Sequence, residues 1–365
     1  MSTIYEIYSM SSSSASHVYP TTHRDETVED HFGQKIPDPY RWLENPDSDE
    51  TRQWVTQQND VTKSFIKSHP DWEKINKKIT TVYNYPKYTS PKKHGNRYFF
   101  SKNDGLQNQN VLYVQDTLES EPRVFLDPNL LSEDGTASLN STAFSESGNL
   151  YAYGVSKSGS DWMTIYVRNV ETEKDMADKL EWVKFTSICW THDDKGFFYG
   201  RYPKPTMSTD KAGVEVDSNE NHMICYHKIG TSQDEDVLVY EDSARPKYSV
   251  STEVTDDGKY LLFYPKNGCK RETEVFYGDL DTFDPNTGLM RIYKLVDGED
   301  AKYDYITNDG QLFYFMTNLK ASRKRVVCID LGNPEPENWK EIVPETNDVL
   351  DFALCVNQSC LVLTY

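Results

Sequence analysis

The sequence predicts a mainly β fold, an incomplete β-propeller preceded by an N-terminal helical segment. Aromatic residues make up 13% of the chain, with 25 Tyr, 15 Phe and 7 Trp, a content typical of sheet-rich proteins. A polar turn that contains a glycine, followed by an aromatic strand, occurs five times. The copies lie about fifty residues apart, which is the spacing of propeller blades that hold several strands each.

The first part of the chain lacks this repeat. Residues 1–20 contain a serine tract and are expected to be disordered. Residues 21–84 are expected to form the helical segment. Asp47 or Ser48 can cap a first helix, in which three large apolar residues lie near helical spacing (Trp54, Val61 and Phe65). A second helix follows Pro70, with apolar residues at intervals of three and four (Trp72, Ile75, Ile79 and Val82).

Residues 85–365 contain the repeat and are assigned to the propeller. The turn glycines are Gly95, Gly148, Gly196, Gly258 and Gly310. We expect each of them to supply the positive φ angle that a tight hairpin needs. The alternative is a long β-sandwich with turns that resemble one another by chance, but a sandwich does not require one signature to recur five times.

A sixth copy begins at Asn357, and the sequence stops within its apolar strand at Tyr365. An isolated domain rarely ends inside such a strand. The sequence therefore favours the front part of a longer polypeptide, with a propeller that is truncated in the sixth repeat.

Composition excludes several partners. The formal net charge of −19 disfavours binding to nucleic acids and to anionic membrane surfaces, and no apolar run approaches the roughly 18 residues of a membrane span. Six cysteines occur without a CxxC pair, so we expect free, mostly buried thiols in a reducing compartment. Neither a metal site nor a cofactor is predicted, because zinc-type spacing and glycine-rich phosphate loops are missing.

No catalytic constellation is visible in the residues themselves. The Gly-x-Ser-x-Gly motif of hydrolases does not occur. The eight histidines all lie at or before His227, and most have polar neighbours in the sequence. His222 and His227 flank a strand and are expected to be exposed on one side.

Specific segments carry a resemblance to a known family. The stretch from Tyr19 to Glu44, which ends in Pro37-Asp38-Pro39-Tyr40-Arg41-Trp42-Leu43-Glu44, resembles the N-terminal signature of the prolyl oligopeptidase family of serine peptidases. Further matching segments are Asn84-Tyr85-Pro86-Lys87-Tyr88, Phe125-Leu126-Asp127-Pro128-Asn129, Ser158-Gly159-Ser160-Asp161-Trp162, and Lys184-Phe185 with Trp190-Thr191-His192. The resemblance covers residues 19–365.

The resemblance implies a serine-type endopeptidase that hydrolyses short peptides on the C-terminal side of proline. Members of the family join a seven-bladed propeller to an α/β-hydrolase domain, on which the N-terminal segment (about residues 1–84) packs. That domain supplies the catalytic triad and would follow Tyr365, since nothing in this sequence matches it. The chain alone is therefore expected to be inactive. Its expected partners are short proline-containing peptides, and the complete protein is expected to be monomeric and cytoplasmic.

Three residues correspond to substrate-contacting positions of the family: Phe185 to an apolar ring, Cys269 to a thiol, and Lys266 to a position that often holds Arg. Phe185 could instead be an aromatic residue of a blade core, and Cys269 a small buried hydrophobe. The family usually has Met near Ser249, so this subsite is expected to be less apolar here. Asp161 and Trp162 are interpreted as structural, with the carboxylate holding backbone N–H groups beside a packed ring.

Two further functions remain open from the sequence. The chain could be a stand-alone propeller that binds a partner, or an inactive truncated product.

Overall fold

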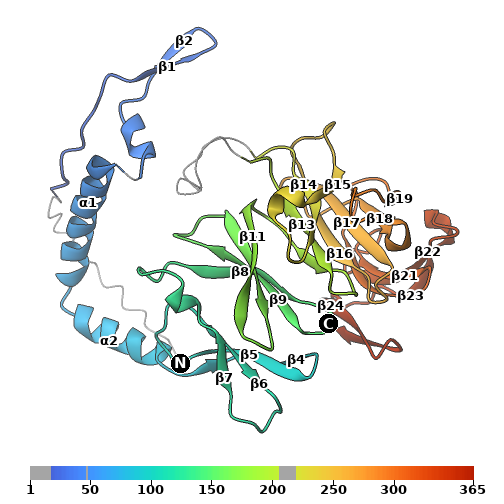
Figure 1. Cartoon of the computed structure of the whole chain (residues 1–365). Coiled ribbons are helices and arrows are strands. Elements are labelled where there is room, and N and C mark those ends of the chain that lie inside the picture. Colours follow the sequence, from blue (N-terminus) through green and yellow to red (C-terminus); the bar gives the residue numbers. More distant parts are fainter. Residues whose placement is uncertain (1–17, 47, 205–218) are drawn as a thin grey trace, which may run out of the picture. The chain divides into compact units, whose positions relative to one another are not determined.

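The computed structural model describes residues 18–46, 48–204 and 219–365. The disorder expected for residues 1–20 therefore falls mostly on residues outside the described ones. The chain forms two compact units, which divide between Tyr85 and Pro86 (Figure 1). Within the described residues, no helix is both long enough and apolar enough to cross a membrane.

The first unit consists of a hairpin and two helices. Strands β1 (Val28–His31) and β2 (Gln34–Pro37) pair antiparallel, and helices α1 (Asp49–Lys67) and α2 (Trp72–Tyr83) follow a short 3-10 turn, η1 (Arg41–Glu44). The Ser48 hydroxyl oxygen accepts a hydrogen bond from the Thr51 N–H at 3.1 Å. This bond satisfies one of the free donors at the start of α1 and confirms Ser48 as the cap, whereas Asp47 lies outside the described residues.

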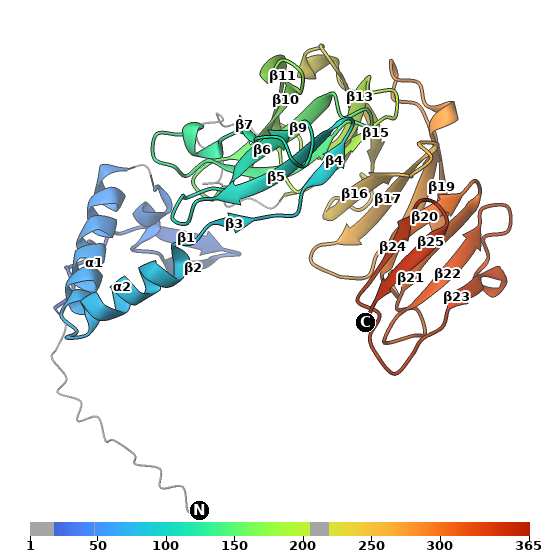
Figure 2. The same ribbon diagram turned by 90° about the horizontal axis from the view of Figure 1, so that it is seen from below.

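The second unit is built from antiparallel sheets, each formed from consecutive strands (Figure 2). We call these sheets blades 1 to 6. Blade 1 contains β3 (Lys87–Tyr88), β4 (Lys92–His94), β5 (Arg97–Asn103), β6 (Val111–Gln115) and β7 (Arg123–Leu126). Blade 2 contains β8 (Ser138–Phe144), β9 (Leu150–Ser156), β10 (Met163–Asn169) and β11 (Lys174–Val183).

Blades 3 to 5 repeat the four-stranded plan of blade 2. Blade 3 contains β12 (Ile188–Trp190), β13 (Gly196–Arg201), β14 (Met223–Lys228) and β15 (Val237–Glu241), with a 3-10 turn, η4 (Gln233–Glu235), before its last strand. Blade 4 contains β16 (Tyr248–Val254), β17 (Tyr260–Asn267), β18 (Val275–Asp279) and β19 (Arg291–Val296). Blade 5 contains β20 (Tyr303–Asp309), β21 (Leu312–Thr317), β22 (Arg325–Asp330) and β23 (Lys340–Val343), and blade 6 contains β24 (Phe352–Val356) and β25 (Cys360–Thr364).

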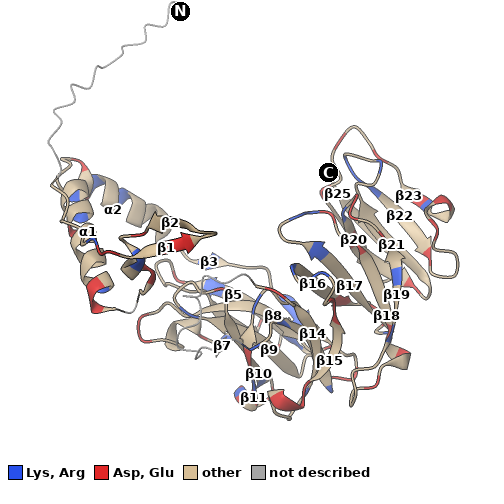
Figure 3. Ribbon diagram, turned by 90° about the horizontal axis from the view of Figure 1, so that it is seen from above, with Lys and Arg blue, Asp and Glu red and all other residues tan. Residues whose placement is uncertain are grey.

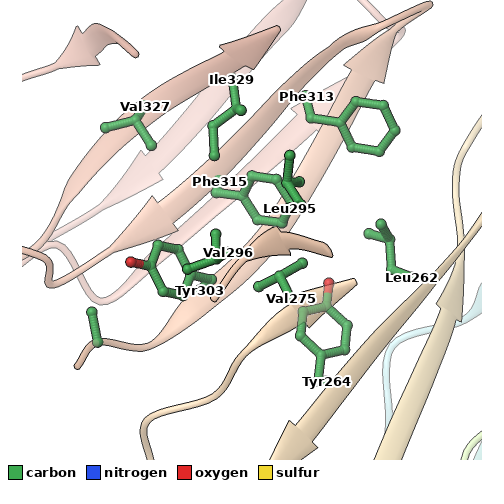
Figure 4. Close-up of a cluster of buried hydrophobic side chains, with 11 residues drawn as sticks. Leu262, Tyr264, Val275, Leu295, Val296, Tyr303, Phe313, Phe315, Val327 and Ile329 are labelled. Atoms are coloured by element: carbon green, nitrogen blue, oxygen red, sulfur yellow. The ribbon is translucent and has the colours of Figure 1, made fainter. Parts of the chain in front are cut away.

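The hydrophobic cores lie between consecutive blades. Figure 4 shows the core between blades 4 and 5, in which Leu262 of β17 and Phe313 of β21 are both fully buried. The second strand of a blade serves both neighbours, because alternate side chains of a strand point to opposite faces. On β13, Phe197 packs into the core with blade 2, and Phe198 packs into the core with blade 4. This alternation explains the aromatic strands of the repeat and confirms the propeller prediction.

The turn glycines play two different roles. Gly95, Gly148, Gly258 and Gly310 all have positive φ angles, as predicted. Gly196 does not, and in its turn Asp194 adopts the left-handed conformation with φ 56°. A Cβ on Gly196 would lie 2.5 Å from Cζ of a tyrosine ring on the neighbouring strand. The expectation for Gly196 was therefore wrong, because close packing rather than backbone conformation requires a glycine there.

These turns also contact one another across the blade boundaries. The Ser145 hydroxyl of blade 2 donates a hydrogen bond to Asp194 of blade 3 at 2.9 Å. The side-chain amide of Asn308 in blade 5 donates to Asp257 of blade 4 at 2.8 Å. The sequence signature therefore joins neighbouring blades as well as forming hairpins.

All six cysteines are free, as predicted. Burial differs among them, however. Cys189, Cys225 and Cys328 are buried, whereas Cys269 and Cys360 are exposed.

Candidate functional site

The first strands of blades 2 to 5 line one pocket of about 900 Å³. These strands are β8, β12, β16 and β20, and each forms an edge of its own sheet. Figure 3 shows β8, β16 and β20 with the basic residues blue and the acidic residues red. First strands of consecutive blades contact one another, as the innermost strands of a propeller do, so the pocket lies on the axial side of the blades. We call its lining the channel wall.

Lys266 and Cys269 both line this pocket. Lys266 is the penultimate residue of β17 and pairs with Ser249 of β16 in the sheet register. Cys269 lies in the loop after β17 and is exposed. The interpretation of Cys269 as a small buried hydrophobe was therefore wrong.

Phe185 lies in the connection between β11 and β12 and is not among the residues that line the pocket. Its side chain is 54% exposed, so the alternative of a blade-core aromatic was wrong. Its φ angle is 53°, a conformation that non-glycine residues adopt at a cost and mainly where surrounding structure enforces it. The Lys184 ammonium group lies 5.3 Å from the Phe185 ring centroid and 4.9 Å from that of Trp162.

Trp162 supports the segment around Phe185. Its ring packs edge-on against Trp182, with centroids 5.4 Å apart, and the residue is only 7% exposed. The packed ring was predicted correctly, whereas the role expected for the Asp161 carboxylate stays a prediction. The Trp162 backbone N–H donates to the Ser160 hydroxyl oxygen at 3.1 Å.

A carboxylate that the sequence reasoning missed, Glu253, also lines the pocket. The residue is solvent-exposed on β16, where the pocket walls lie on one side of it. Desolvation by these walls, together with the negative charges of Asp256 and Asp304, raises the pKa of Glu253 to about 7, although the Tyr264 hydroxyl donates to it at 3.3 Å. The alternation of Val250 and Thr252 with polar residues along β16 was a signal that could have placed Glu253 in the channel.

The pocket is also lined by basic residues, two of which form ion pairs. Lys302 contacts Asp304 at 2.7 Å, and Lys270 contacts Glu299 at 2.8 Å. Both signs of charge are therefore present on this wall.

The two histidines that were expected to be exposed are buried, with 2% exposure for His222 and none for His227. Burial lowers the pKa of His222 to about 4. His227 contacts carboxylate oxygens of Asp236 and Asp178 through its two ring nitrogens, at 2.6 and 3.0 Å. Its ring therefore has no free nitrogen with which to accept a proton from a nucleophile.

In the part of the chain that the structure describes, no three His, Cys, Asp or Glu side chains are grouped so that they could hold a metal ion. The channel wall combines apolar and charged side chains, and such a lining can bind a ligand through direct contacts.

Comparison with known proteins agrees with this architecture. The family model described as "Prolyl oligopeptidase, N-terminal beta-propeller domain" matches residues 19–365. The chain is 37% identical to prolyl oligopeptidase A of Amanita bisporigera over 354 residues, which cover 90% of this chain and 46% of that protein. It is 36% identical to prolyl endopeptidase of Elizabethkingia meningoseptica over 334 residues, which cover 92% of this chain and 46% of that protein.

A solved structure has the same arrangement. Prolyl oligopeptidase B from Galerina marginata, bound to a 35-residue hydrolysis and macrocyclization substrate, superposes with a TM-score of 0.80 at 34% sequence identity. The match covers 94% of this chain and 50% of that one. The chain thus spans about half the length of the relatives it matches.

Proposed function

Because this chain belongs to the prolyl oligopeptidase family, we propose that it is the substrate-gating propeller of a serine endopeptidase that cleaves short peptides on the C-terminal side of proline. The observation that carries the proposal is the channel wall formed by the first strands of blades 2 to 5. A ring of blades above an active site admits flexible peptides and excludes folded proteins. It also removes bulk water, which strengthens electrostatic stabilisation of the reaction.

In this proposal the chemistry comes from a hydrolase domain that follows Tyr365, and the chain alone does not hydrolyse peptides. The sequence lacks Gly-x-Ser-x-Gly. The buried His227 supports the same view, because carboxylates occupy both of its nitrogens. The nucleophile, base and oxyanion donors are therefore assigned to the part of the enzyme that this chain does not contain.

Lys266, Cys269 and Phe185 are proposed to contact the substrate. All three lie at the same end of their blades, the end where the first strand begins. Phe185 directly precedes β12, the first strand of blade 3. Lys266 and Cys269 lie at the end of β17, opposite the start of β16, the first strand of blade 4. The Phe185 ring is exposed and so can cover an apolar peptide side chain. The hydroxyl of Ser249, opposite Lys266, makes this subsite more polar than the methionine usual in the family.

We assign the helical segment of residues 21–84 to contact with the hydrolase domain. Helix α2 presents apolar side chains that are about half exposed in this chain, at helical spacing (Ile75, Ile79 and Val82). A monomeric, cytoplasmic enzyme is proposed for the complete protein, and the six free thiols support a reducing compartment.

The test is reconstitution. The chain is co-expressed with the hydrolase half of the Elizabethkingia meningoseptica enzyme, and turnover is followed with a fluorogenic Gly-Pro peptide and with a folded protein that contains proline. We expect the peptide to be hydrolysed and the folded protein to remain intact. Cleavage of both substrates at similar rates would contradict a gating role, and so would a hydrolase half whose selectivity is the same with and without this chain.

A further inference from the structure

His227 of β14 lies between two carboxylates that come from different blades. Its Nδ1 is 2.6 Å from an Asp236 carboxylate oxygen, and its Nε2 is 3.0 Å from an Asp178 carboxylate oxygen. Side-chain exposure is at most 1% for all three residues. Because Asp178 belongs to β11 of blade 2 while His227 and Asp236 belong to blade 3, the imidazole ring joins the two blades.

The other groups around the ring are also defined. The Tyr199 hydroxyl of β13 donates to the second Asp236 oxygen at 2.6 Å, and the Gly230 N–H donates to Asp178 at 2.6 Å. The Phe197 ring covers one side of the imidazole, with ring centroids 5.4 Å apart. The guanidinium group of Arg201 interacts with Asp236 through its charge. Two carboxylates thus face a single ring, and each can accept a hydrogen bond from it only if both ring nitrogens carry protons.

The burial of this cluster distinguishes it from the ion pairs between blades 1 and 2. Blades 1 and 2 are joined by ion pairs from Arg97 to Glu171 and from Arg123 to Glu173, but these pairs are partly solvent-exposed. A buried charge that loses its partner costs far more free energy than an exposed one. The protonation state of His227 should therefore affect the boundary between blades 2 and 3 strongly.

We propose that the doubly protonated His227 ring is a pH-sensitive link between blades 2 and 3, which holds β14 against β11 and releases it when the ring loses a proton. The proposal concerns the propeller itself and does not depend on the proposed peptidase function.

The titration behaviour of the ring supports this geometry. Burial alone would lower the pKa of His227, but its hydrogen bonds to Asp178 and Asp236 outweigh that effect and raise it to about 9, above the ordinary value of 6.5. For Asp178, the hydrogen bonds from His227 and Gly230 outweigh burial and lower its pKa. A raised histidine pKa contributes stability that is complete below pH 6.5 and is lost as the pH rises through 9.

Two buried cysteines allow the opening of this boundary to be measured. Cys225 lies in the core between blades 2 and 3, and Cys189 lies in the core between blades 3 and 4. Burial raises the pKa of both thiols to about 11, so the pH dependence of the thiols themselves cancels in a ratio. The full 365-residue chain is alkylated with iodoacetamide under native conditions, and the modification rates of the two cysteines are compared by peptide mass spectrometry.

The expected result is a Cys225-to-Cys189 rate ratio that rises by about tenfold per pH unit between pH 6.5 and 9, as the release of one proton on opening requires. His227→Gln should raise the ratio at pH 6.5 and abolish its dependence on pH. The matched control is His222→Gln, because His222 is a second buried histidine and contacts a backbone N–H rather than a carboxylate. In this variant the rate ratio should rise with pH as it does in the unaltered chain.

A ratio that does not change with pH in the unaltered chain would overturn the proposal, as would a slope that survives in His227→Gln. If that variant does not fold, nitrogen NMR of the unaltered chain decides. A His227 ring that is doubly protonated at pH 8 supports the link, and one that titrates near pH 6.5 refutes it. Asp178→Asn keeps a hydrogen-bond acceptor but removes a charge, so it should move the His227 titration to lower pH.

Discussion

Gly95 of blade 1 and Gly148 of blade 2 lie backbone against backbone where the turns of the two blades meet. A Cβ on Gly148 would lie 2.9 Å from the Cα of Gly95 and closer still to its amide nitrogen. The glycine of the repeated turn is therefore fixed by the neighbouring blade as well as by its own φ angle of 73°.

Gly148→Ala should consequently destabilise the chain more than the backbone angle alone predicts. Gly159→Ala is the matched control, because Gly159 has φ 74° but nothing within 4 Å of the added Cβ. In both variants the free energy of unfolding should fall by about 1–2 kcal/mol, because alanine is strained in the left-handed conformation. In Gly148→Ala it should fall by about 1–3 kcal/mol more because of overpacking. Denaturant unfolding measures the difference, and equal losses in the two variants would show that the blades do not meet at these turns.

Glu253 should reduce stability at neutral pH. Because its folded-state pKa of about 7 lies above the ordinary value of 4.5, the folded chain binds the proton more tightly, and stability falls as the pH rises from 4.5 to 7. Glu253→Gln should therefore raise the melting temperature relative to the unaltered chain more at pH 8 than at pH 4.5. Glu146→Gln, at an exposed position of the same pocket, is the control. An equal shift at both pH values would mean that Glu253 titrates normally.

The exposed and buried cysteines should differ in reactivity. At pH 7.5, Cys269 should be alkylated at least about a hundredfold faster than Cys189, whose burial raises its pKa to about 11. Peptide mass spectrometry after a short exposure to iodoacetamide measures both rates, and Cys269→Ser identifies the fast site. Similar rates would contradict the exposure of Cys269 in the lining of the pocket.

Substitution of Phe185 should affect substrate hydrolysis with little effect on stability, whereas substitution of Trp162 should reduce stability. Phe185→Ala removes an exposed ring, so the free energy of unfolding should change by no more than about 0.5 kcal/mol, whereas Trp162→Ala should cost about 3–5 kcal/mol. In the reconstituted enzyme, Phe185→Ala should lower kcat/KM for a proline peptide by about fivefold to tenfold, the loss expected for one partly buried ring. Unchanged kcat/KM would remove Phe185 from the proposed substrate contacts.

The fold could be predicted from the sequence because its signals are local. A glycine turn and the alternation of the following strand are both contained within about ten residues, so the blade pattern was visible without any knowledge of distant contacts. Gly196 shows the limit of this reasoning. Its glycine is required by Tyr226, which lies thirty residues further along the chain, and a turn motif contains no information about such a neighbour.

The buried histidines were mispredicted for the same reason. His227 looks polar and solvent-exposed in its own segment, but Asp178, which balances its charge, lies 49 residues away. The proposed site is a mixed case. The pairing of Ser249 with Lys266 follows from the hairpin between β16 and β17, whereas the exposure of Phe185 depends on a left-handed residue that side-chain chemistry does not predict.

The central claim, that this chain forms the channel wall of a peptidase without performing the hydrolysis, is tested most directly by assaying the purified 365-residue chain with a fluorogenic Gly-Pro peptide. The account predicts no turnover above the rate in buffer. Turnover that a serine-directed inhibitor abolishes would contradict it, because it would place a working nucleophile within these residues.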